Sequence, residues 1–116
     1  MSARLATSVL VGGLVRKAES QGGFAAILAK GNPTAGSLIL VLAERGCAKA
    51  ILERILQPDG TYSWQSVGAR LGDDIGKSLD VPALVARRRR SDPDLWVIEL
   101  DIPSAERFGA EMNSQG

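Results

Sequence analysis

The densest group of residues that can do chemistry lies between positions 87 and 101, where an arginine run is followed by a short acidic segment. Four consecutive arginines occupy positions 87–90, and the carboxylates that follow are Asp92, Asp94, Glu99 and Asp101. Guanidinium groups bind phosphates and carboxylates, and carboxylates bind hard cations such as Mg²⁺. The segment can therefore bind an anion, bind a metal ion, or neutralise itself.

The charge distribution along the chain favours neutralisation. Residues 1–90 hold 13 Lys/Arg and 7 Asp/Glu, a net charge of +6, whereas residues 91–116 hold 1 Arg and 6 Asp/Glu, a net of −5. The two values sum to the overall +1. A dedicated nucleic-acid-binding domain usually carries a clear basic excess. We therefore expect the arginines to pair with the acidic C-terminal segment, and we do not expect nucleic acid as the partner.

Helical geometry separates the four arginines. Successive residues of a helix step by about 100° around its axis, so the run covers most of the circumference and cannot meet one partner. Relative to an apolar stripe at positions 81, 84 and 85, Arg88 points toward the core and Arg90 points away. We predict a structural ion pair made by Arg88 with the acidic residues Asp92, Asp94, Glu99 and Asp101.

Two functional alternatives remain for this segment. The first is an anion- or RNA-binding patch made of Arg87, Arg89 and Arg90, although no aromatic residue interleaves the run for base stacking. The second is a Mg²⁺-dependent phosphoester-processing enzyme. Glu99 and Asp101 lie two apart on an expected strand and so share a face, but such enzymes usually add a lysine, and none follows Lys77. The competing interpretation is that these carboxylates pair with arginines and face water.

The chain contains no histidine, which removes the commonest general base and the commonest metal ligand. Ser-His-Asp and Cys-His catalytic arrangements are excluded. We predict no catalytic residue, no metal site and no cofactor, and we favour a non-catalytic binding or assembly module over an enzyme. The sequence does not identify the partner and leaves two alternatives open, a second copy of the chain bound through a sheet edge or another protein.

Hydrophobic periodicity and turn signals predict a single α+β domain over residues 1–112, followed by a disordered tail over 113–116. Its mainly antiparallel five-stranded sheet has helices packed on it in the order α-β-β-β-β-α-β-α. The expected helices cover 8–20, a segment capped by Asp80 and stopped by Asp92-Pro93, and 103–112; the expected strands cover 24–30, 37–44, 48–57, 61–67 and 94–102.

Finer expectations follow from composition within these elements. The segment 38–42 is apolar on both faces and should be the most buried strand, and four consecutive strands joined by turns predict an antiparallel meander. Gly12-Gly13 inside the first helix suggests close approach of its backbone to the sheet. Pro58-Asp59-Gly60 predicts a hairpin turn. Residues 68–80 are compatible with helix or loop.

Bulk properties place the domain in the cytoplasm. At 116 residues with 45% hydrophobic content, the chain has the size and composition of one soluble domain. A single cysteine cannot form an internal disulfide, and no apolar run reaches the roughly 20 residues that span a bilayer. The apolar stretch 6–15 is followed at once by Arg16-Lys17, which fits an amphipathic helix better than a signal peptide. We therefore expect no membrane association.

The segment 87–101, with its arginine run followed by Asp92-Pro93-Asp94-Leu95-Trp96, resembles a family of small uncharacterised bacterial proteins found mainly in alphaproteobacteria and known as a domain of unknown function. Other stretches that fit the resemblance are Met1 to Leu5, Gly22-Gly23-Phe24-Ala25, Ala35-Gly36, Leu52-Glu53-Arg54 and Pro58-Asp59-Gly60. The resemblance implies a stand-alone cytosolic domain. It implies no activity, cofactor or catalytic residue.

Overall fold

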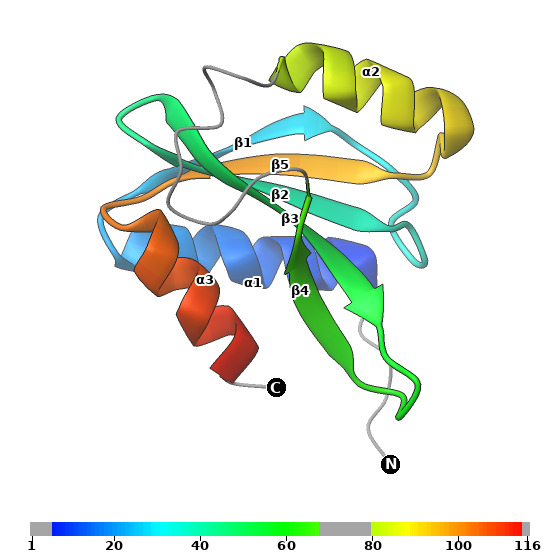
Figure 1. The fold of residues 1–116 in the computed structure, drawn as a ribbon, viewed down its shortest axis with the longest axis horizontal. Helices are drawn as coiled ribbons and strands as arrows, with labels where there is room; N and C mark the ends of the chain where they lie inside the picture. Colours follow the sequence, from blue (N-terminus) through cyan, green and yellow to red (C-terminus); the bar gives the residue numbers. More distant parts are fainter. Residues whose placement is uncertain (1–5, 68–79, 115–116) are drawn as a thin grey trace.

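The computed structural model describes residues 6–67 and 80–114 and contains the predicted elements in the predicted order (Figure 1). The elements are α1 (Thr7–Ser20), β1 (Phe24–Ala29), β2 (Leu38–Glu44), β3 (Cys47–Leu56), β4 (Tyr62–Ser66), α2 (Val81–Ser91), β5 (Trp96–Asp101) and α3 (Ala105–Ser114). The α+β class is confirmed. The ambiguous segment 68–80 lies outside the described residues except for Asp80, which caps α2 by accepting from the Ala83 N–H. Positions 115–116 of the expected tail also lie outside.

The five strands form one sheet in the order β1-β5-β2-β3-β4. The predicted hairpins β2–β3 and β3–β4 are antiparallel, but the expected four-strand meander is wrong at its first step. The last strand, β5, inserts between β1 and β2, pairing antiparallel with β1 and parallel with β2. The loop between β1 and β2 therefore spans the width of a third strand, which no local turn signal can encode.

That loop closes around the beginning of β5. The Asn32 N–H donates to the Asp94 carbonyl at 3.0 Å, and the Trp96 N–H donates to the Ser37 carbonyl at 2.8 Å. The Trp96 indole Nε1 donates to the Asn32 carbonyl at 2.7 Å. A side chain at Gly36 would overlap the Asp94 carbonyl, so glycine is required for this approach. The loop and the entry to β5 hold each other in place.

Helices cover both faces of the sheet (Figure 1), as a strand that is apolar on both sides requires. β2 is buried over Leu38–Ala43, as its sequence predicts. α1 and α3 cover one face, whose core includes Leu40, Leu42, Ile98, Leu100 and Phe108. α2 covers the other face, whose smaller core contains Ile39, Val41, Ile51, Leu84, Leu95 and Val97. Among the described helices, none has the length and apolar character to cross a membrane.

The β3–β4 hairpin forms at the predicted turn, where Gly60 has a φ of 90°. The Asp59 carboxylate accepts hydrogen bonds from the Thr61 N–H at 2.9 Å and from the Thr61 hydroxyl at 2.6 Å. Both bonds lower the pKa of Asp59, and the bond from the Thr61 hydroxyl has the larger effect. The local sequence is sufficient for this turn.

The expectation that Gly12-Gly13 brings α1 close to the sheet is wrong. A Cβ at Gly12 would meet only the Arg16 guanidinium, and a Cβ at Gly13 would meet no described atom within 4 Å. The close contact occurs after the helix, at Gly23, where a Cβ would overlap the Asp101 carbonyl. The paired glycines inside α1 therefore weaken the helix without a packing reason that the structure shows.

We predict that Gly13→Ala raises the free energy of unfolding by about 0.5–1 kcal/mol, because alanine has the higher helix propensity and its methyl group meets open space. Gly23→Ala is the matched control and should lower stability by more than about 1 kcal/mol through overlap with β5. Urea unfolding of both variants measures the two effects. A destabilised Gly13→Ala protein would mean that α1 does approach another part of the chain.

Candidate functional site

The arginine run begins with a bridge between α2 and the sheet. Arg88 Nη2 lies 2.6 Å from Glu53 Oε2 on β3, and the two side chains are 32% and 22% exposed. The helical geometry expected of Arg88 is observed, since its side chain turns toward the sheet. Its partner corrects the expected pairing, because Glu53 lies on a strand that precedes α2 and not in the acidic segment 92–101. The sequence separation of 35 residues made this partner inaccessible to local reasoning.

The three arginines of the alternative anion patch differ in their surroundings. Arg89 donates from Nη1 to the Lys30 carbonyl at 3.2 Å and from Nη2 to the Pro93 carbonyl at 3.1 Å. It thereby ties the end of α2 to the ends of the neighbouring strands. The side chains of Arg87 and Arg90 are exposed and make no hydrogen bond or ion pair with another described residue. The helix thus leaves Arg87 and Arg90 exposed, three residues apart, whereas Arg89 is bonded to main-chain carbonyls.

The acidic residues of the segment 92–101 also do not act as one group, since each has its own local surroundings. Asp92 ends α2, and its Oδ1 accepts from the Asp94 N–H at 3.2 Å in the turn that leads into β5. Asp94 is exposed, and Glu99 is partly buried on β5. Neither forms an ion pair with an arginine among the described residues. The described parts of the chain contain no group of three side chains placed to hold a metal ion.

Asp101 binds the turn between β2 and β3. Its two carboxylate oxygens accept from the Arg45 N–H at 3.1 Å and from the Gly46 N–H at 2.7 Å. Arg45 and Gly46 have φ values of 54° and 79°, which direct successive N–H groups into one concavity that suits an anion. The alternative use of Asp101 beside Glu99 as a metal ligand would require giving up these bonds.

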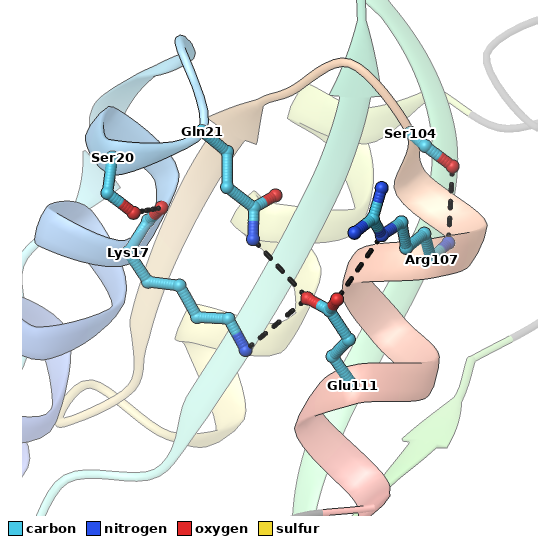
Figure 2. Close-up of polar contacts among 6 residues, drawn as sticks. All are labelled: Lys17, Ser20, Gln21, Ser104, Arg107 and Glu111. Carbon is cyan, nitrogen blue, oxygen red and sulfur yellow. Dashed lines mark hydrogen bonds and ion pairs between the residues drawn. The ribbon is translucent and has the colours of Figure 1, made fainter.

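A polar cluster joins α1 to α3 on the opposite side of the sheet (Figure 2). Glu111 accepts from Gln21 Nε2 at 3.3 Å and from Arg107 Nε at 3.3 Å, and Lys17 Nζ lies 3.9 Å from it. Lys17 also lies over the Phe108 ring, 5.0 Å from its centroid. This cluster was not predicted from the sequence, although the four-residue spacing of Arg107 and Glu111 indicates one of its pairs. It braces two helices and exposes no reactive arrangement.

The two edge strands of the sheet differ in the hydrogen bonds of their outward-facing main-chain groups. At the β4 edge, Asn113 Oδ1 accepts from the Trp64 N–H at 2.9 Å, and Asn113 Nδ2 donates to the Trp64 carbonyl at 3.0 Å. One side-chain amide thus satisfies the main-chain groups that the middle of β4 turns away from β3. Asn113 belongs to α3, so the expected disordered tail does not begin there. This arrangement obstructs the pairing of another strand at the middle of the β4 edge.

The β1 edge is open. Trp96 and Ile102 donate their N–H groups toward β2, so the odd-numbered residues of β5 face β1. Phe24 and Ala26 lie opposite odd-numbered β5 residues, and alternation therefore leaves the main-chain groups of Ala25 and Ile27 pointing to the free side. Among the described residues, none outside β5 bonds to the main chain of 24–29.

The side chains of β1 are exposed and apolar, although it is an edge strand. Phe24 is 63% exposed, Ile27 is 54% exposed and Leu28 is 41% exposed. The strand reads Phe-Ala-Ala-Ile-Leu-Ala and contains no charge and no proline, the residues that usually protect an edge. Only an irregularity of the pairing between Ile27 and Ala29 interrupts it. Among the described surfaces, the β1 edge has the clearest features of a contact site.

Comparisons with known proteins identify the family of this chain. The model of the family "Protein of unknown function (DUF1491)" matches residues 5–110, and the chain therefore belongs to that family. A crystal structure of a DUF1491 family protein from Caulobacter crescentus is similar over 90% of this chain and 94% of that chain, with 29% identity and a TM-score of 0.74. The solution structure of protein Atu0922 from A. tumefaciens is 28% identical over 88% of this chain and 89% of that one, with a TM-score of 0.69. None of the curated proteins compared matches the chain.

We predict that Arg88→Ala lowers the free energy of unfolding by about 1.5–3 kcal/mol, because it leaves the partly buried Glu53 carboxylate without its charged donor. Arg90→Ala removes an exposed cation from the same helix and should change stability by less than about 0.5 kcal/mol. Chemical denaturation of both variants makes the comparison. Equal stability of the two proteins would show that the Arg88–Glu53 bridge contributes nothing in solution.

Proposed function

We propose that this DUF1491 protein is a non-catalytic binding or assembly module, and that its contact surface is the open edge of β1. The observation that carries the proposal is the contrast between the two edge strands of the sheet, β1 and β4. The main chain of Trp64 on the β4 edge is bonded by the Asn113 amide, whereas the β1 edge presents main-chain groups that no described residue bonds, together with exposed apolar side chains. An extended segment of another polypeptide satisfies both features at once by adding a strand.

The charged residues support this assignment because several of them make contacts that stabilise the fold and are not free for catalysis. Arg88, Arg89 and Asp101 are each engaged in contacts that hold the fold together. Recruiting them for catalysis or for phosphate binding would break those contacts. An RNA-binding function would have to rest on Arg87 and Arg90, which the structure does not join into one surface with Arg89. The main chain of β1 has no such competing task.

The proposed location is the cytoplasm. The chain has one cysteine, Cys47, and so forms no internal disulfide, which suits a reducing compartment. In such a compartment an exposed apolar edge needs a partner, because unpaired edges otherwise promote nonspecific association. The binding partner is expected to be a protein segment that is extended, mainly apolar and about six residues long, matching the length of β1.

A peptide display library tests the surface directly. Random ten-residue peptides are selected on the wild-type protein and then measured against two variants. Ile27→Lys places a charge on the open edge, and Gln65→Lys places the same charge on the exposed side of β4. We expect apolar peptides that bind with dissociation constants on the order of 1–100 µM and lose at least about tenfold in affinity on Ile27→Lys only.

Two outcomes of that selection would contradict the proposal. One is a library that yields no peptide with affinity above the level of an unrelated control protein. The other is a set of peptides that bind Ile27→Lys as well as they bind the wild type, which would place the contact surface elsewhere. Circular dichroism of both lysine variants confirms that each retains the fold before binding is compared.

A further inference from the structure

We infer that the β1 edge is occupied by β1 of a second copy of this chain, in antiparallel orientation, so that two five-stranded sheets become one ten-stranded sheet. This inference rests on the proposed function and names its partner. Three independent features of the edge support a second copy: the positions of its free main-chain groups, the absence of charge within the strand, and the arrangement of charge at its two ends. Figure 1 shows β1 as the outer strand, next to β5.

The main chain of β1 is self-complementary. A two-fold axis through Ala26 places Ala25 of one copy opposite Ile27 of the other. These are the two residues whose N–H and carbonyl groups point to the free side, so the same hydrogen bonds form twice. Ala26 lies opposite itself as a non-hydrogen-bonded pair, and its small side chain leaves room for close approach of the strands.

The side chains also suit self-pairing. With this register, Phe24 of one copy lies opposite Leu28 of the other, and both residues are exposed in the single chain. Apolar cross-strand neighbours of this kind stabilise a sheet, whereas like charges placed opposite each other destabilise it. Since residues 24–29 carry no charge, a symmetric contact creates no repulsion.

Charge at the ends of β1 selects the antiparallel orientation. Lys30 directly follows the strand, and Glu19 lies in the last turn of α1 before it; both are exposed. Antiparallel pairing brings Lys30 of one copy to the end of the strand where Glu19 of the other lies. A parallel pairing would instead set Lys30 beside Lys30.

The closed β4 edge limits the assembly to two copies. A contact between β1 of one copy and β4 of the next would repeat without closure and build a filament. Asn113 already binds the N–H and the carbonyl of Trp64, in the middle of the strand that such a contact would use. The symmetric β1–β1 contact is the arrangement that both edges permit. Because a six-residue strand gives an interface below the size of standard stable complexes, the dimer should be weak.

Sedimentation velocity over about 10–500 µM protein measures the assembly. We expect a concentration-dependent shift from monomer to dimer, with a dissociation constant on the order of 10–100 µM and no larger species. Ile27→Lys should remain monomeric over the whole range, whereas Gln65→Lys should behave as the wild type. A wild-type protein that is monomeric at the highest concentration overturns the inference, and so does an Ile27→Lys protein that dimerises as the wild type does.

Cross-linking tests the register. In a Cys47→Ser background, Ala26→Cys places one thiol per chain beside the proposed two-fold axis, where a non-hydrogen-bonded pair has a Cα separation of about 4.5 Å. That separation lies within the range of disulfides. Under mild oxidation we expect covalent dimers from this variant, and at least about tenfold fewer from a control with Gln65→Cys in the same background. Equal yields from the two variants overturn the pairing.

The two sets of experiments can reject the dimer without rejecting the proposed function. If the wild-type protein is monomeric but library peptides bind it and discriminate against Ile27→Lys, the edge is a contact surface for a different protein and only the dimer is rejected. If no peptide binds and the protein is monomeric, the proposed function is rejected as well.

Discussion

The insertion of β5 between β1 and β2 is the constraint on which the rest of the structure depends. It places Val97 and Ile98 in the middle of the sheet, where Val97 is buried on the face covered by α2 and Ile98 on the face covered by α1 and α3. It requires the β1–β2 loop to close around Asp94 and Trp96. It also requires a glycine at position 36, because a side chain there would overlap the Asp94 carbonyl. It also decides which strands are left at the edges, because β1 is separated from β2 and becomes the outer strand.

The charged residues around β5 stabilise this crossing. Arg89 holds the end of α2 against the carbonyls that flank β1 and β5, and Asp101 at the other end of β5 holds the β2–β3 turn. Arg88 binds α2 to β3. The segment that looked richest in chemistry is therefore used to position a strand. What remains for recognition is the main chain and the apolar side chains of β1.

Local elements could be predicted from the sequence because their causes are local. The double-sided burial of β2, the turn at Pro58-Asp59-Gly60 and the Asp80 cap each follow from neighbouring residues. The place and direction of β5 could not be predicted, since a strand that arrives after a helix can pair on either side. The partner of Arg88 and the use of Asn113 were missed for the same reason. A sheet-edge contact was expected, but which edge is open depends on where β5 lies.

Amide hydrogen exchange, measured residue by residue at two protein concentrations, tests the central claim that one sheet edge is closed within the chain and the other is open to a second copy. In dilute solution we expect fast exchange at Ala25 and Ile27 and slower exchange at Trp64, whose N–H is bound by Asn113. At high concentration, exchange should slow at Ala25 and Ile27 and stay unchanged at Trp64. Protection of Ala25 and Ile27 that is equal at both concentrations would show that the β1 edge does not pair with a second copy.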